Sequence, residues 1–334
     1  MDRKIIAIFM MVLWGIIFYF FIFPSFNLQQ FHKSLTNIRT PLFFLALFAI
    51  LIGNIAGGIR WSLIMKEINA QHSQNFFNAI GIFCFGQVAG LIVPSRVGNY
   101  TKVPLIVKLD RITYEDGLSA VNAETILDLG YISGAGIISI IILSMYFANY
   151  TVFSSILIFL TLIISSIALI ILYKIHHFQG IYENFVALSS DLHQNRLVHF
   201  LALFFKKFFD IIQSTRKIFS HRSTAVKLCC YTLITQFFGI VGLFFIIESV
   251  HISPSFIEIF AILTVTYIIG IASLIPGGIG ASDLSLIALL GYEGIPLSVA
   301  TNIAILWRVA MYLPVLLIVG VYFMRENLIK KDIL

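Results

Sequence analysis

Apolar residues occur along this chain in long runs that are separated by short polar stretches. A helix that crosses a bilayer needs about 20 apolar residues. The first run follows Arg3 and Lys4 and exceeds the apolar region of a cleavable signal peptide, which has about 7–15 residues. The pattern predicts six membrane-spanning helices, at residues 5–23, 41–59, 117–146, 152–172, 226–250 and 295–324.

Two further apolar stretches are interrupted by proline and glycine. Residues 76–93 lead into Pro94-Ser95-Arg96-Val97-Gly98, and a short apolar piece follows at 103–109. Residues 257–275 lead into Pro276-Gly277-Gly278-Ile279-Gly280, and a short piece follows at 284–290. Both interruptions read Pro-x-x-[Val/Ile]-Gly. Because proline and glycine break helices, we expect two broken re-entrant hairpins, at 76–109 and 257–290.

Composition agrees with a membrane protein. Hydrophobic residues make up 59% of the 334 residues and charged residues 11%, whereas soluble domains carry roughly 25% charged residues. We therefore predict an all-α, polytopic protein whose residues 1–334 form a single membrane domain, with no folded basic surface for nucleic acid. Cys84, Cys229 and Cys230 lie in apolar segments and the histidines lack ligand spacing, so no metal or cofactor is expected.

The distribution of positive charge predicts the orientation in the membrane. Residues 173–225 contain seven Lys or Arg against three Asp or Glu, a net charge of +4, and such a linker is typically cytoplasmic. Basic residues at both ends place the N- and C-termini in the cytoplasm, and the protein in the plasma (inner) membrane. With Arg60 and Lys66 assigned to a cytoplasmic turn, hairpin 76–109 enters from the cytoplasm and hairpin 257–290 from outside. Within the linker, one apolar helical face predicts a helix lying in the membrane interface: Phe204, Phe205, Phe208, Phe209 and Ile212.

The surroundings of the two interruptions also match. Each follows a span that starts about fifty residues upstream and precedes a span with a buried charge about thirty residues downstream. We predict an inverted repeat with residues 41–146 and 226–324 as its halves. In transporters of this kind the broken helices meet near mid-membrane and form the site, because freed backbone groups need protein or a wet cavity. The alternative is that Pro94 and Pro276 simply end helices at the membrane surface.

Three ionisable residues fall within predicted spans. Glu124 and Asp128 are four residues apart and share a helical face, and Arg308 lies near the middle of the last span. Each would cost about 2.5–3.5 kcal/mol if it faced lipid, so each needs a partner or a wet cavity. Two interpretations remain open: a structural acid–arginine pair between the two repeats, and a polar path for a lipid head group or a proton.

The residues around the interruptions form motifs that resemble a known family. Pro94, Gly98 and Lys102 fit Pro-x-x-x-Gly-x-x-x-[Arg/Lys], and the second interruption with Asp283 fits Pro-Gly-Gly-Ile-Gly-x-x-acid, with Ala300 and Arg308 downstream. Over about residues 1–325 the chain resembles the flippase-like family that includes the membrane region of lysylphosphatidylglycerol synthase. It departs at Asn99, where the family usually has an acid, and at Asp283, where the family usually has Glu. The soluble aminoacyl-transferase domain of the full synthase is not among these residues, so we expect no aminoacyl transfer.

The resemblance implies movement of a charged lipid between leaflets, with aminoacylated phosphatidylglycerol and polyprenyl-phosphate-linked sugars as candidates. It implies that Arg96, Lys102 and Arg308 attract phosphate. Asp283, Glu124 and Asp128 would balance these cations or meet a cationic head group. The candidate substrate-binding residues are Pro94, Arg96, Gly98, Lys102, Glu124, Asp128, Pro276, Gly277, Gly278, Gly280, Asp283 and Arg308.

Two other functions compete with transport. A membrane-embedded lipid-modifying or glycosyl transferase usually carries an acidic pair in an early outer loop, but residues 24–40 contain no Asp or Glu. The chain also lacks a nucleophile–base arrangement and a phosphate-binding Gly-Lys-Ser/Thr motif, so we do not expect an enzyme. A non-catalytic partner that presents lipid to a separate transferase remains open, and co-purification with such an enzyme would favour it.

Overall fold

The protein is built from long apolar helices and shorter helical hairpins. A computed structural model describes residues 38–68, 75–93, 95–110, 112–146, 211, 213–273 and 275–331. Four helices in these ranges are long and apolar enough to cross a membrane: α3 (Thr40–Ile68), α6 (Tyr114–Tyr146), α10 (Arg222–Ser249) and α13 (Leu297–Lys331). The prediction of a multi-pass, all-α membrane protein is confirmed. The spans predicted at 5–23 and 152–172, and most of the 173–225 linker with its amphipathic face, lie outside the described residues.

The shorter helices flank the two interruptions. In the first half, α4 (Phe76–Ile92) is followed by the 3-10 helix η2 (Ser95–Thr101) and α5 (Lys102–Asp110). In the second half, α11 (Phe256–Ala272) is followed by the irregular residues 275–280 and α12 (Ala281–Tyr292). Both halves therefore run in the same order, from a long helix through a broken hairpin to another long helix.

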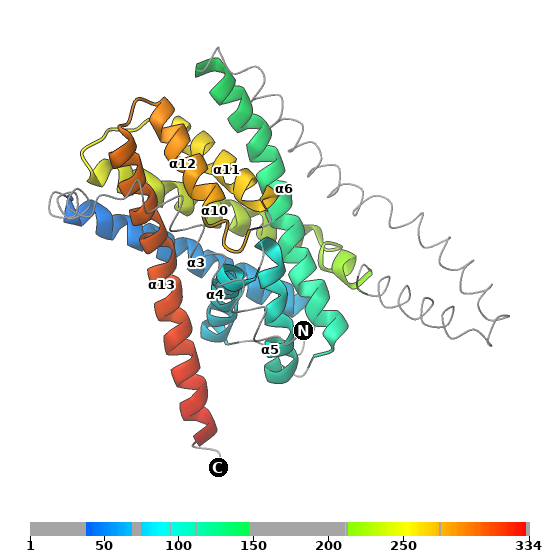
Figure 1. The fold of residues 1–334 in the computed structure, drawn as a ribbon. Helices are drawn as coiled ribbons and strands as arrows, with labels where there is room; N and C mark the ends of the chain where they lie inside the picture. The colour runs from blue at the N-terminus through cyan, green and yellow to red at the C-terminus, as the bar shows by residue number, and fades with distance from the viewer. Residues whose placement is uncertain are drawn as a thin grey trace, which may run out of the picture.

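Helices α3 and α10 form an antiparallel pair at the centre of the fold (Figure 1). The amide of Arg39 donates to the carbonyl of Ser249 at one end (2.9 Å), and the Thr224 hydroxyl donates to Glu67 at the other (2.8 Å). Between these ends, Gly53 lies against the α10 backbone at Thr235. In Figure 1, α4 and α5 lie on one side of this pair, and α11 and α12 lie on the other.

The remaining contacts cross between the halves. Helix α4 packs against α13, where the rings of Phe85 and Phe323 are 5.8 Å apart and Arg325 lies 5.2 Å from the Phe77 ring. In the same way, α11 of the second half packs against α6 of the first. Each hairpin is thus held by the last long helix of the other half, and this arrangement brings both interruptions to the centre.

The outward faces of the long helices carry large apolar side chains. Phe48 on α3, Phe237 on α10 and Leu317 on α13 are exposed to between 49% and 61%. A soluble protein rarely exposes apolar surface so continuously, whereas lipid accepts it at no cost. The inner faces instead carry alanines, glycines and the charged residues described below.

The assignment of Arg60 to a cytoplasmic turn is wrong. Helix α3 continues nine residues beyond Ile59, to Ile68, and Arg60 is 1% exposed. The reason is that Trp61, Ile64 and Met65 continue an apolar helical face that packs in the core, while acids on α6 compensate the charge of Arg60. Of the two cations assigned to this turn, only Lys66 remains as a charge that favours a cytoplasmic position.

Candidate functional site

The second interruption contacts the first half at the last turn of α4, just before the first interruption. The backbone N–H of Gly277, in the second interruption, donates a hydrogen bond to the carbonyl of Gly90 in the last turn of α4 (2.8 Å). The side chain of Leu91 lies beside the same glycine. A backbone group freed by a broken helix is therefore satisfied by the other half of the protein, as burial in a membrane requires.

Glycines allow this close approach, but the two interruptions have different backbones. A Cβ on Gly98 would overlap the backbone of Gly90, and a Cβ on Gly278 would lie 3.3 Å from the Cα of Gly270. Gly277 and Gly278 both have φ +61°, the left-handed region that favours glycine. Gly98 lies in η2 and is not among the left-handed glycines of the described chain. The shared Pro-x-x-[Val/Ile]-Gly pattern therefore does not produce a shared conformation.

Arg308 holds the second interruption together. Its Nε and Nη2 donate to the two carboxylate oxygens of Asp283 (2.6 and 3.1 Å), and Nη2 also donates to the Ser282 hydroxyl (2.6 Å). Its Nη1 donates to the carbonyl of Gly277 (2.9 Å) and to the hydroxyl of Tyr312 (3.1 Å). An arginine has five N–H donors, and all five are engaged here. Asp283 in turn accepts from the backbone N–H of Gly280 (2.9 Å) and so caps α12.

A second ionic cluster lies in the first half. Arg60 donates to Asp128 (2.6 Å) and to Glu124 (3.1 Å), and Lys102 pairs with the other Glu124 oxygen (2.5 Å). The hydroxyl of Thr232 on α10 also accepts from Arg60 (3.0 Å). Two cations therefore face two carboxylates, and the cluster is formally neutral.

Lys102 is enclosed within the first half. Its side chain is 1% exposed, and its Nζ lies 4.6 Å from the Trp61 ring and 5.5 Å from the Phe83 ring. A Cβ on Gly86 would overlap the lysine stem, so glycine at that position makes room for it. Lys102 does not line the cavity described below, and its interactions are those of a structural residue.

An acid–arginine pair between the two repeats, one of the two interpretations left open by the sequence, is not formed among the described residues. Glu124 and Asp128 pair with Arg60 and Lys102 of their own half, and Arg308 pairs with Asp283 of its own half. The physical reason is proximity. Each hairpin brings a counter-charge to the long helix that follows it, Lys102 to α6 and Asp283 to α13. The interpretation as a structural pair between the repeats is therefore wrong, and each half is neutralised separately.

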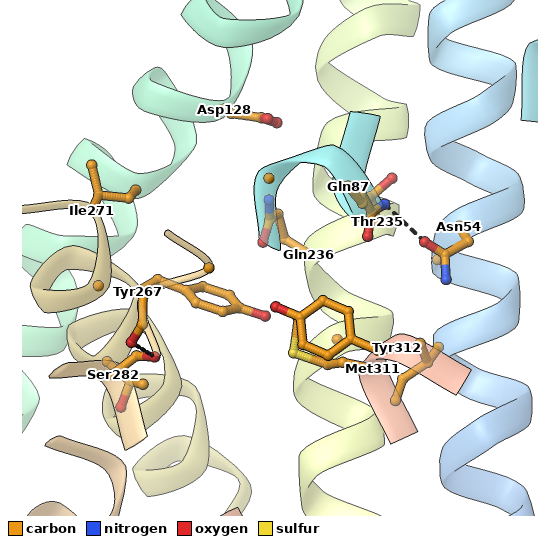
Figure 2. A pocket seen from close by; sticks show the side chains of 18 of the residues that line it. Asn54, Gln87, Asp128, Thr235, Gln236, Tyr267, Ile271, Ser282, Met311 and Tyr312 are labelled. Atoms are coloured by element: carbon orange, nitrogen blue, oxygen red, sulfur yellow. Dashed lines mark hydrogen bonds between the residues drawn. The ribbon is translucent and has the colours of Figure 1, made fainter. Parts of the chain in front are cut away.

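A cavity of about 320 Å³ lies between the two clusters. Helices α3, α4, α6, α10, α11, α12 and α13 all contribute to its wall, together with Asn99 of η2 and the glycines of the second interruption. Figure 2 shows the hydroxyls of Tyr267 and Tyr312 pointing toward one another across it. The Gln87 amide donates to Asn54 (2.9 Å) on another side of the wall (Figure 2). The charged residues of the wall are Arg60, Glu124, Asp128, Asp283 and Arg308.

The sequence-predicted residues divide into three groups. Six of them line the cavity: Glu124, Asp128, Gly277, Gly278, Asp283 and Arg308. Four lie outside its lining: Gly98, Lys102, Pro276 and Gly280. The placement of Pro94 and the side chain of Arg96 lie outside the described residues. The structure thus brings ten of the twelve candidates to one region, although most of the polar residues that line the cavity were not among them.

The residues missed from sequence are mainly uncharged. Asn54, Gln87, Gln236 and Tyr267 line the cavity together with Arg60. For the three amides, the signal is a side-chain amide within an otherwise apolar run, since an amide that faced lipid would leave its hydrogen-bonding groups unsatisfied. Because these amides carry no charge, the pattern of charges within the spans does not indicate them.

Together these features define a class: a multi-pass α-helical membrane protein with two broken hairpins around a polar cavity. The profile of the family described as "Lysylphosphatidylglycerol synthase TM region" matches residues 5–319. The chain therefore belongs to this family, as its motifs predicted. No curated protein matches the chain.

Proposed function

We propose that the protein is a lipid flippase, which moves an anionic or head-group-modified lipid between the two leaflets. Phosphatidylglycerol-type and polyprenyl-phosphate-type lipids are the candidates. The observation that carries the proposal is the polar cavity at the meeting point of the two interruptions, walled by both halves of the chain. The acyl or prenyl chains would remain in the bilayer while the head group occupies this cavity.

Carrying the polar head group of a lipid through hydrocarbon is costly. Each unsatisfied polar group costs several kcal/mol there, so unassisted head-group transfer is slow. A cavity lined by amides, hydroxyls and paired charges lowers this cost, because it replaces the water that the head group loses. The apolar outer faces of the same helices stay in contact with lipid.

The matched order of the two halves supports an alternating mechanism. We infer that 41–146 and 226–324 form an inverted repeat, with both termini in the cytoplasm of the plasma (inner) membrane and the hairpins entering from opposite faces. In such folds one half rocks against the other around a fixed central site. The antiparallel α3–α10 pair, which joins the halves, is the contact around which that motion would occur.

A cavity-filling variant tests the proposal. A Cβ on Gly239 of α10 would meet only the Tyr267 hydroxyl, at 3.8 Å, so Gly239→Leu places a side chain in the cavity without a backbone clash. We expect it to abolish leaflet exchange of chain-labelled phosphatidylglycerol and polyprenyl-phosphate lipid in proteoliposomes, while thermal stability is retained. Gly134→Leu, on an exposed face of α6 with nothing within 4 Å, is the matched control and should exchange lipid normally. Full exchange in the Gly239→Leu variant would contradict the proposal.

A further inference from the structure

The charges around the cavity leave little for a charged ligand to bind. All five donors of Arg308 are engaged by Asp283, Ser282, Gly277 and Tyr312. Arg60 faces two carboxylates, and its Nε, which has no partner among the described residues, is buried. Every cation in the described wall is therefore already compensated by an acid.

The uncharged polar groups of the same wall have hydrogen-bonding capacity to spare. Gln236 makes no hydrogen bond to any described residue, and Figure 2 shows its amide within the cavity below Asp128. The Gln87 amide nitrogen donates to the Asn54 amide oxygen, which leaves the amide nitrogen of Asn54 and the amide oxygen of Gln87 without a partner among the described residues. The Tyr312 hydroxyl accepts from Arg308 and still has its own proton to donate.

These groups present donors and acceptors together. A side-chain amide offers both, and a hydroxyl offers both. The ligand group that complements them is one that also donates and accepts at neighbouring atoms, namely a set of adjacent hydroxyl groups. An ammonium only donates and a phosphate dianion only accepts, so each would satisfy part of this wall and leave the rest unpaired.

We propose, on the basis of the flippase function above, that the cavity selects lipids by an uncharged polyhydroxyl head, a glycerol or a single sugar. Gln236, Asn54, Gln87 and Tyr312 bind the hydroxyls. The phosphate, where the lipid has one, is not the group that these four side chains select. A lipid whose head ends in an ammonium is disfavoured.

The size of the cavity is consistent with this ligand. Its 320 Å³ corresponds to about ten water molecules at roughly 30 Å³ each, which is the scale of one monosaccharide ring. The electrostatic cost of burying a charge in the cavity also favours an uncharged ligand. Moving an ionised group into a low-dielectric site costs several kcal/mol unless an unpaired counter-charge awaits it, and both clusters are formally neutral.

Binding in detergent tests the selectivity without requiring transport. The purified full chain is titrated with four lipids of identical acyl chains, namely phosphatidylglycerol, monoglucosyl diacylglycerol, phosphatidic acid and lysyl-phosphatidylglycerol, and the melting temperature is followed. We expect apparent affinities about tenfold higher for one or both polyhydroxyl lipids than for the other two, the difference of one to two net hydrogen bonds. The first two arms separate a glycerol from a sugar. Equal or tighter binding of phosphatidic acid or lysyl-phosphatidylglycerol overturns the inference.

A pair of variants tests whether the Gln236 amide is responsible for the selectivity between lipids. Gln236→Leu should weaken binding of the preferred lipid about tenfold and leave phosphatidic acid unchanged. Gln213→Leu makes the same substitution at an exposed position away from the cavity and should change neither. If Gln236→Leu weakens all four lipids equally, the amide has a structural role and the inference fails.

Leaflet exchange of the same four lipids separates the two proposals. Selective binding without exchange above protein-free vesicles would contradict the flippase function and leave the polyhydroxyl selectivity standing. Exchange with equal rates for all four head groups would support the flippase function and contradict the selectivity.

Discussion

The amide of Gly277 donates a hydrogen bond to the carbonyl of Gly90, 2.8 Å away, and this bond joins the second interruption to the turn of α4 that precedes the first. Gly98 packs against the same Gly90 from within the first half. Both interruptions therefore contact the same turn of α4. A substitution that disturbs the packing around Gly90 should affect the contact between the two halves.

Gly98→Ala should destabilise the protein. The new Cβ would overlap the backbone of Gly90, and overpacking of this kind typically costs about 1–3 kcal/mol. We expect a lower melting temperature in detergent. Gly134→Ala is the control, because its Cβ meets nothing within 4 Å and alanine is favoured over glycine in a helix by about 1 kcal/mol. Equal melting temperatures for the two variants would show that the interruption does not pack on α4.

Lys102→Met should also destabilise the protein strongly. It removes one cation from the buried cluster and leaves Glu124 and Asp128 with Arg60 alone, and breaking a buried pair costs about 3–5 kcal/mol. Adding Glu124→Gln should restore part of the loss, with a coupling energy above about 1 kcal/mol. Lys227→Met, at an exposed position of α10, should melt close to wild type. Additive losses in the double variant would contradict a direct pair.

Arg308→Ala should unfold the second interruption. The substitution removes five hydrogen bonds and leaves Asp283 uncompensated, at a cost of about 3–5 kcal/mol. The expected result is a large fall in melting temperature, which the further change Asp283→Asn partly reverses. A variant that melts like wild type but no longer exchanges lipid would instead assign Arg308 to direct head-group binding.

Glu293 gives the protein a pH dependence outside the spans. Burial, and then the negative charge of Glu258, raise the pKa of this carboxyl above its ordinary 4.5. The folded state therefore binds more protons than the unfolded state between these two pKa values, and stability falls as pH rises through that window. Glu293→Gln should flatten this fall and raise the free energy of unfolding at neutral pH by at most about 1 kcal/mol, because the site is partly exposed, and a higher melting temperature would report it. Parallel pH profiles for variant and wild type would contradict this origin.

The order of helices was predictable because a helix that crosses the bilayer needs about 20 apolar residues, and such runs are visible in the sequence. Helices α10 and α13 begin within a few residues of the predicted bounds, and Pro276 with its glycines ends α11 where expected. Arg60 was misplaced because a charge after an apolar run resembles a loop residue. Only the tertiary approach of Glu124 and Asp128, from a different helix, makes its burial possible.

The ion-pair partners could not be predicted from spacing. Four residues separate Glu124 from Asp128, which correctly places both on one face of α6, but spacing does not say which cation that face meets. Asp283 and Arg308 are brought together by the left-handed glycines 277, 278 and 280. The shared motif does not specify those dihedral angles, because the matching residues around Gly98 fold as a 3-10 helix.

The most direct test of the account is whether water reaches the meeting point of the interruptions within the membrane. Gln236→Cys and Phe237→Cys are made in a chain in which Cys84, Cys229 and Cys230 are replaced, and sealed vesicles are treated with a small charged thiol reagent. Gln236 lines the cavity, whereas Phe237 is 49% exposed on the outer face of the same helix. We predict rapid labelling at position 236 and none at position 237. Equal labelling at the two positions, or none at either, would contradict a wet central cavity.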